Sequence, residues 1–96
     1  MLELGGKSAA IVHDDADLVA FENDVRWGIY FNAGQVCSAM SRVIVHDSVH
    51  DELVDRMVGV AQSLTVKPGA EQPDFGPTMG AMVSEDQRDR AAQMVS

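Results

Sequence analysis

Cys37 is the only thiol in this chain of 96 residues, and the residue types around it suit a reactive nucleophile. It lies in a short run without regular periodicity, shortly after Gly34, whose missing side chain lets other groups approach the backbone. Ser38 is small, and Arg42 is a cation that favours the thiolate if its side chain folds back. A thiol on such a loop is open to a substrate. The loop alone nevertheless favours burial of Cys37 as a small apolar residue, because unpaired cysteines are most often buried.

Glu3 is the second candidate for chemistry, since it stands between Leu2 and Leu4 and directly before Gly5 and Gly6. The alternation of apolar and acidic residues predicts a strand that ends in a tight turn. If the leucines are buried, Glu3 lies against a low-dielectric wall, and such surroundings raise the pKa of a carboxyl group into the range of a general base. The alternative makes Glu3 the solvent-facing residue of a terminal strand.

The elements before the cysteine read as one strand followed by one helix. Residues 9–13 form an apolar run that predicts a buried parallel strand. The carboxylates of residues 14–17 are expected to cap the helix, an interpretation that we favour over a site for a hard metal ion. The helix is expected to end at residues 32–34, where glycine is a stop signal. Its apolar side chains recur at helical spacing: Leu18, Phe21, Val25 and Ile29.

A second strand and helix follow the cysteine. Residues 42–46 predict another buried strand, and Asp47 and Ser48 are expected to cap the helix, with Asp51 in the reciprocal position. His46 and His50 fall on the strand end and the first helical turn, so they share no metal-binding face. The apolar stripe of this helix comprises Val49, Leu53, Val54, Met57, Val60, Ala61 and Leu64.

The last third of the chain is less regular. Residues 65–80 hold all three prolines and are predicted to be a loop without regular structure. Ser84 begins a third predicted helix, with Gln87 placed to complete a capping box. The predicted strand starts at residue 1 with no loop before it, and the third predicted helix reaches Ser96 without a glycine or proline to end it. We therefore expect the chain to be a piece of a longer protein.

Composition and charge exclude several classes of function. Fifteen acidic and seven basic residues give a net charge of −8, which repels phosphate backbones and anionic membranes, so neither nucleic acid nor a membrane is expected as a partner. The hydrophobic content of 46% is that of a globular protein. A single cysteine forms no internal disulfide, and no leader precedes the first element, which favours a cytoplasmic setting. No metal site is expected.

Residues 2–8 and 34–39 resemble the glutamate and cysteine signatures of the NAD(P)-dependent aldehyde dehydrogenase superfamily, and their separation also agrees with that family. The resemblance extends to residues 14–17, to Ser41-Arg42 and to residues 75–77. It implies an α/β fold, namely part of a three-layer α/β/α catalytic domain with parallel strands and packed helices. Residues 1–96 would be a single fragment of that domain, without the nucleotide-binding domain. The resemblance also reverses the expectation that Cys37 is buried.

The resemblance implies a mechanism in which Cys37 is the nucleophile. Its thiolate would attack an aldehyde to give a thiohemiacetal, and hydride transfer to NAD or NADP would leave a thioester. Glu3 would then act as the base that activates the hydrolytic water. The backbone amide of Cys37 would be one donor to the oxyanion.

Binding roles are also implied by the resemblance. The backbone at three residues would contact the nicotinamide: Leu4, Gly5 and Gly6. Three side chains would shape the substrate site: Phe31, Val36 and Ser38. The run from Gly34 to Ala39 is similar to that of members acting on small polar amino or betaine aldehydes.

The sequence departs from the family pattern at Ala9, where many members have proline, and at Met40, where glycine is common and a larger side chain is expected to crowd the cysteine loop. The implied partners are a small-molecule aldehyde, the remainder of the parent enzyme and further copies in a homo-oligomer. Without the cofactor cleft, the isolated chain is expected to be inactive. Two other hypotheses remain, a truncated non-catalytic remnant and a cofactor-free thiol-reactive protein.

Overall fold

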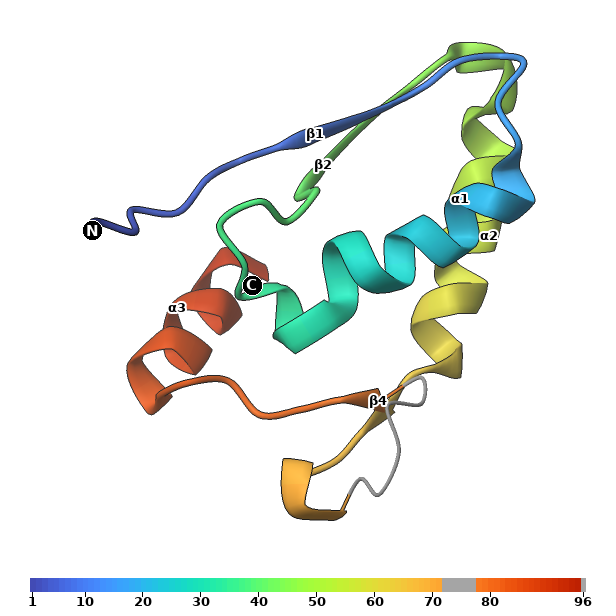
Figure 1. The fold of residues 1–96 in the computed structure, drawn as a ribbon. Helices are drawn as coiled ribbons and strands as arrows, with labels where there is room; N and C mark the ends of the chain where they lie inside the picture. Colours follow the sequence, from blue (N-terminus) through green and yellow to red (C-terminus); the bar gives the residue numbers. More distant parts are fainter. Residues whose placement is uncertain (72–77, 96) are drawn as a thin grey trace.

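The structure, a computed structural model, describes residues 1–71 and 78–95. A strand, a helix and a second strand open the chain, and two further helices and two very short strands follow (Figure 1). The strands are β1 (Ala9–Val12), β2 (Arg42–Val45), β3 (Thr65–Val66) and β4 (Thr78–Met79), and the α-helices are α1 (Leu18–Val25), α2 (His50–Ser63) and α3 (Glu85–Val95). The single helical turns are a π-helical turn (Arg26–Tyr30) and 3-10 turns at Phe31–Gly34, Asp47–Val49 and Gly69–Glu71.

β1 and β2 form a parallel pair at the two apolar runs. The prediction that both strands are buried is wrong for β2, which has no buried residue, whereas Ala10 and Val12 of β1 are buried. Their register runs from Ala9 opposite Arg42 to Val12 opposite Val45. Beyond β2, the backbone N–H of His46 donates to the Val12 carbonyl oxygen at 2.8 Å. The connection between the two strands passes through α1 and the cysteine loop, so the first half of the chain is a βαβ unit (Figure 1). Parallel strands with packed helices confirm the predicted α/β class.

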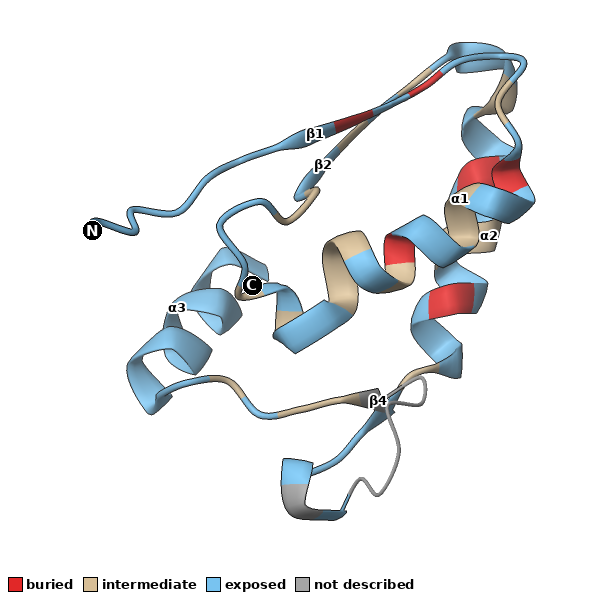
Figure 2. Cartoon of the chain, viewed as in Figure 1, coloured by how far each residue is buried: buried red, intermediate tan, exposed pale blue. Residues whose placement is uncertain are grey.

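The core lies where β1, α1 and α2 meet. Val12, Leu18 and Leu53 form its buried cluster, one residue from each element. Figure 2 shows the buried positions confined to these three elements. α1 and α2 are also joined by an ion pair, in which Arg56 Nη1 lies 2.6 Å from Glu22 Oε1.

The helix starts agree with the sequence prediction in two cases out of three. Asp17 Oδ1 accepts hydrogen bonds from the backbone N–H groups of Val19 and Ala20, both at 3.0 Å, which confirms the acidic cap of α1. Ser84 Oγ likewise accepts from the backbone N–H of Gln87 at the start of α3.

The predicted cap of α2 by Asp47 and Ser48 is wrong. A 3-10 turn occupies Asp47–Val49 and moves the helix start to His50. The backbone N–H of Ser48 therefore donates to the ring of His46, at 3.3 Å from Nδ1, and Asp51 pairs with the neighbouring His50 ring instead of closing a capping box.

The predicted strand at the N-terminus is also wrong. Residues 1–8 have no regular structure, and Leu2 and Leu4 are 85% and 87% exposed. An alternating pattern becomes a strand only where a neighbouring strand accepts its hydrogen bonds, and no described strand forms a ladder with this segment. No turn is assigned within residues 1–8, although Gly5 adopts the left-handed region that glycine permits, with φ of +79°.

The predicted loop at residues 65–80 contains regular structure at both ends. Thr65 pairs with Thr78 and Val66 with Met79, so β3 and β4 form a second parallel pair. Strands of two residues carry no periodic signal, which is why the breaker residues dominated the prediction. The residues at 75–77 that contribute to the family resemblance lie outside the described part of the chain.

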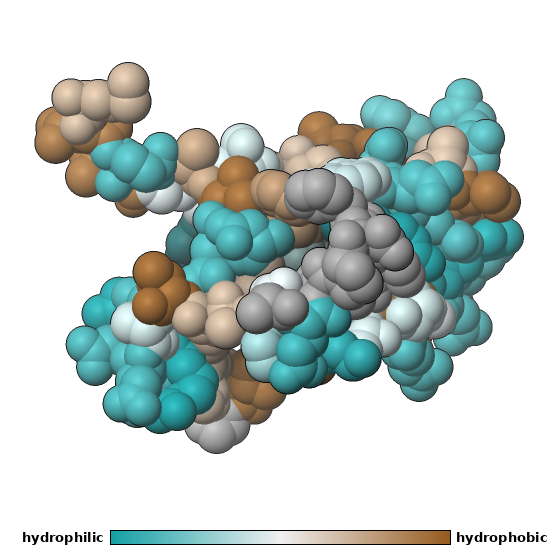
Figure 3. Space-filling model, turned by 60° about the horizontal axis from the view of Figure 1, so that its bottom comes forward, coloured by the Kyte–Doolittle hydropathy of each residue, from teal (hydrophilic) through white to brown (hydrophobic). Residues whose placement is uncertain are grey.

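The chain is less compact than a complete domain of its length. Its radius of gyration is 14.5 Å, whereas about 12.5 Å is typical for 96 residues. The N-terminal segment extends away from the rest (Figure 1), and many apolar side chains remain in view on the surface in Figure 3. Ile11 and Ile44, opposite each other in the sheet, are 66% and 52% exposed. One sheet face is therefore uncovered.

Candidate active site

Cys37 lies in a turn that leads from the 3-10 turn at Phe31–Gly34 to β2. The backbone N–H of Ala39 donates to the Val36 carbonyl oxygen at 3.0 Å, which places Cys37 and Ser38 at the two central positions of the turn. Cys37 is exposed, so the prediction from the loop alone of a buried cysteine is wrong. Among the described residues, the Cys37 backbone N–H has no hydrogen-bond acceptor.

The backbone that leads into this turn is strained. Asn32 and Ala33 have φ of 52° and 56°, and Gly34 follows with φ of 74°. The left-handed region costs a residue other than glycine roughly 1–2 kcal/mol. Two such residues in succession reverse the chain between the helical turns and the cysteine, and backbone strain of this kind is typical of functional sites.

Gln35 offsets this strain with hydrogen bonds at both ends of its side chain. Its Nε2 donates to the Asn32 carbonyl oxygen at 2.9 Å, and Asn32 Nδ2 donates to the Gln35 carbonyl oxygen at 3.1 Å. Gln35 Oε1 accepts from the backbone N–H of Val83, at 2.8 Å, although the two residues are 48 positions apart. The sequence analysis missed Gln35. The only feature that could have indicated its role is a carboxamide, which both donates and accepts hydrogen bonds, directly after the loop glycine Gly34.

Gly6 brings the N-terminal segment against the cysteine loop. A Cβ built on Gly6 would clash with the carbonyl oxygen of Cys37 and would lie 3.6 Å from its carbonyl carbon. Two hydrogen bonds from Arg42 hold the same segment, one from its backbone N–H to the Ser8 carbonyl oxygen at 3.3 Å and one from Nε to the Lys7 carbonyl oxygen at 3.1 Å. Arg42 therefore anchors this segment, and its described hydrogen bonds go to backbone carbonyl groups of the segment and not to the thiol.

Glu3 is held at the other end of this segment. Its Oε1 accepts from the backbone N–H of Gly5 at 2.8 Å, and Gly5 has a positive φ of 79°. Leu2 and Leu4 are exposed, so the low-dielectric wall expected beside Glu3 is missing from this chain. The two candidate groups thus lie on separate loops that touch where Gly6 meets Cys37.

Two of the candidate substrate residues, Val36 and Ser38, belong to the turn itself, and Phe31 begins the 3-10 turn that precedes it. Phe31, Val36 and Ser38 are all exposed. The Phe31 ring packs on Trp27 with a centroid distance of 5.8 Å and an interplanar angle of 40°. Trp27, which is 63% exposed, was missed by the sequence analysis because an aromatic residue at helical spacing is normally a core residue.

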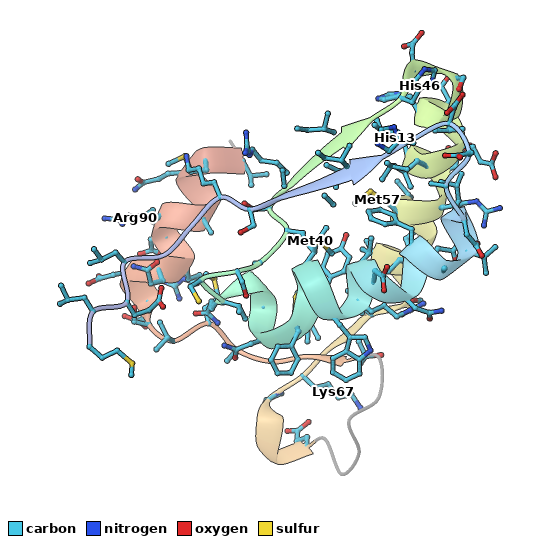
Figure 4. The ribbon with its side chains drawn as sticks, turned by 45° about the horizontal axis from the view of Figure 1, so that its top comes forward. His13, Met40, His46, Met57, Lys67 and Arg90 are labelled. Carbon is cyan, nitrogen blue, oxygen red and sulfur yellow. The ribbon has the colours of Figure 1, made fainter. Side chains whose placement is uncertain are left out.

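Met40 packs on the π-helical turn that precedes the site. Its backbone N–H donates to the Gly28 carbonyl oxygen at 2.8 Å, and a Cβ on Gly28 would clash with the Met40 methyl group. The larger side chain therefore fits because Gly28 leaves room for it, and Figure 4 shows Met40 beside this helical turn.

The histidines do not form a metal centre in the described part of the chain. His13 and His46 follow β1 and β2 at the same edge of the sheet (Figure 4), and both are exposed. Residues 1–71 and 78–95 contain no group of three or more side chains able to hold a metal ion. The same described residues form no helix long and apolar enough to cross a membrane.

Fold and site together define an α/β protein with an exposed thiol on the crossover between two parallel strands and a carboxylate on the neighbouring loop. The chain belongs to the aldehyde dehydrogenase family, because the model of that family matches residues 1–96. The structure of betaine aldehyde dehydrogenase from Staphylococcus aureus in complex with NAD+ is similar, with a TM-score of 0.85 and 33% identity over 97% of this chain.

Curated relatives agree with this family. A mitochondrial aldehyde dehydrogenase of Leishmania tarentolae is 49% identical over 93% of the chain, and a vanillin dehydrogenase of Amycolatopsis is 44% identical over 99% of it. The chain spans only 17% and 19% of the length of these two proteins and 18% of the Staphylococcus aureus structure.

Proposed function

We propose that this chain carries the nucleophile and the base of an enzyme that oxidises an aldehyde to a carboxylic acid with NAD or NADP. The observation that carries the proposal is the contact between Gly6 and the backbone of Cys37, because it joins the glutamate segment to the cysteine loop. Membership of the aldehyde dehydrogenase family supports the reaction class.

Cys37 would form a bond from its sulfur to the aldehyde carbonyl carbon, giving a thiohemiacetal whose oxyanion is stabilised by the Cys37 backbone N–H. The unpaired state of that N–H among the described residues supports this role. After hydride leaves the carbon, a thioester remains. Glu3 would take a proton from a water molecule, which attacks the thioester, releases the carboxylic acid and returns the sulfur as thiolate.

The residues assigned to the cofactor fit a flat group that approaches the backbone. Leu4, Gly5 and Gly6 are exposed, and a Cβ built at Gly5 would meet no described atom within 4 Å. A nicotinamide held there would supply the acceptor for the hydride. The named NAD+ complex of the Staphylococcus aureus relative favours NAD.

The exposed side chains beside the thiol are the proposed substrate contacts. Phe31 and Val36 offer apolar surface, and Ser38 offers a hydroxyl group next to the nucleophile. The resemblance of the cysteine loop to enzymes of small polar amino or betaine aldehydes is in line with the betaine aldehyde dehydrogenase structure. We propose that class of aldehyde as the first to test.

The remaining parts of the enzyme would come from the rest of the parent polypeptide. The nucleotide-binding domain, the second oxyanion donor and the cover of the open sheet face are assigned to it, and the parent enzyme is proposed to be a homo-oligomer. The cytoplasmic setting stays a prediction, since one relative is named as mitochondrial.

The test compares the 96-residue chain with the complete polypeptide that contains it. With betaine aldehyde and NAD, the complete protein should form NADH and carry a thioester on Cys37 that mass spectrometry detects. The C37S variant should lack both, while the S41A variant, which changes a hydroxyl on the same loop, should keep both. The 96-residue chain alone should form no NADH. A complete protein that neither forms NADH nor acylates Cys37 would leave the non-catalytic remnant as the better hypothesis.

A further inference from the structure

We propose that Gln35 is a positioning residue, which holds the cysteine turn in place by tying it to the backbone of Val83 at the start of the C-terminal helix. The proposal rests on the proposed function of Cys37 as nucleophile. Gln35 touches neither the sulfur nor the proposed base through any described contact, so its effect on the reaction would be indirect.

The first argument is that both ends of the Gln35 carboxamide are used. Nε2 donates to the Asn32 carbonyl oxygen at 2.9 Å and Oε1 accepts from the Val83 N–H at 2.8 Å. A carboxamide supplies a donor and an acceptor on two separate atoms, and Gln35 uses both. Gln35 is of intermediate exposure and both hydrogen bonds are open to solvent, so their geometry and not burial supports the positioning role.

The second argument is the strain that the Gln35 contacts offset. Asn32 and Ala33 are both held in the left-handed region, and a loop of this kind relaxes unless its surroundings fix it. The backbone and side chain of Gln35 make three hydrogen bonds with Asn32, at 2.9, 3.1 and 3.1 Å. These three hydrogen bonds hold the chain reversal in place two residues before Cys37.

The third argument is where the far end of the contact lies. Val83 directly precedes Ser84, which caps α3 through its Oγ and accepts the Arg88 N–H through its carbonyl oxygen, at 3.1 Å. The hydrogen bond from Val83 therefore anchors the cysteine turn on a helix start and not on a free loop. It is a long-range contact that ties the cysteine turn to the start of α3.

The kinetic test uses the complete polypeptide and the variant Q35M, which keeps the side-chain length and removes both hydrogen bonds. We expect kcat for aldehyde oxidation to fall by about tenfold to a hundredfold, the effect of two neutral hydrogen bonds, while KM for NAD stays within about twofold because the cofactor contacts are elsewhere. The matched control Q62M, on the exposed face of α2, should change neither value. A Q35M enzyme with unchanged kcat would overturn the proposal.

A double-mutant cycle tests whether Val83 is the partner. The V83P variant removes the donor N–H at a position that is 80% exposed. If the hydrogen bond positions the turn, V83P should lower kcat, and adding Q35M should lower it by less than the product of the two single effects. Fully independent effects would overturn the role of Val83.

Amide hydrogen exchange tests the hydrogen bond between Val83 and Gln35 independently of the proposed function. In the wild-type protein the Val83 amide should exchange about tenfold more slowly than in Q35M, whether or not the protein oxidises aldehydes. Q35E retains the acceptor, so it should keep this protection at neutral pH while losing the bond to Asn32. Equal exchange of Val83 in wild type and Q35M would refute the contact. An inactive wild type with a protected Val83 would refute the proposed function alone.

Discussion

Gly6 shows how a single missing side chain can bring two functional segments together. The carbonyl oxygen of Cys37 occupies the space that a Cβ on Gly6 would fill, and this oxygen belongs to the backbone, which yields less readily than a flexible side chain. The glycine is therefore required by packing, and its φ is not the reason. The contact also sets how far the Glu3 loop lies from the nucleophile.

Replacement of Gly6 by alanine should consequently displace the cysteine turn. For G6A we expect kcat of the complete enzyme to fall by about a hundredfold, since a misplacement of about 1 Å costs this much in a reaction that depends on orientation. Steady-state kinetics and thioester trapping on Cys37 measure the loss. G59A is the matched control, because a Cβ on Gly59 in α2 meets no described atom within 4 Å. That variant should gain about 0.5–1 kcal/mol of stability from helix propensity. Equal activities of G6A and G59A would contradict the packing argument.

Among the elements, α1 and α2 are held together by Arg56 as well as by their apolar faces. Its guanidinium lies 2.6 Å from Glu22 Oε1 on α1 and 2.9 Å from Glu52 Oε1 one turn earlier on α2. Hydrogen bonds to Glu22 and then to Glu52 raise the pKa of Arg56 above its ordinary value. The contribution of Arg56 to stability is therefore fully present below its pKa in the unfolded state. It is lost only as the pH rises through the higher pKa of the folded state, so the arginine stays charged throughout the neutral range.

The R56M variant should therefore have a lower Tm than the wild type at neutral pH, because two carboxylates lose their partner. The difference should shrink as salt is added, since the pair is partly exposed and screened. Thermal unfolding at low and high ionic strength measures it. R90M on α3 removes the same charge from an exposed side chain that has no described ion pair. A Tm loss in R56M that salt leaves unchanged would point to lost packing of the arginine stem instead.

The elements that sequence predicted correctly are those whose signal is local. Helical spacing from Leu18 to Val25 and the carboxylate of Asp17 specify α1 within a dozen residues, and the apolar runs at 9–13 and 42–46 specify the parallel pair. The hydrogen bond from Val83 to Gln35 connects residues 48 positions apart, and no periodicity encodes it. The roles of Cys37 and Glu3 stay predictions, whereas the contacts that hold their loops could not be predicted from the sequence.

On the scale of the whole molecule, the helical patterns in the sequence are those of a folded domain, but the chain exposes more surface than a compact domain does. The chain exposes 7311 Å², whereas a compact protein of 10.3 kDa exposes about 5,400 Å². A parallel sheet normally has both faces covered, but Ile11 and Ile44 stand exposed side by side on β1 and β2. The sequence showed their apolar character, and it did not show that the sheet face they share would be open in this chain.

The I11S variant should consequently have opposite effects in the two contexts. In the 96-residue chain, serine removes exposed apolar surface, so sedimentation should show less self-association at the same concentration. In the complete polypeptide, where we expect the sheet face to be covered, the same change should lower the free energy of unfolding by about 1.5–3 kcal/mol, the value of a buried isoleucine side chain. V58S, at an exposed position of α2, controls for loss of a surface side chain. Equal and small effects of I11S in both contexts would mean that this face stays open in the parent protein, and the three-layer arrangement would then have to be abandoned.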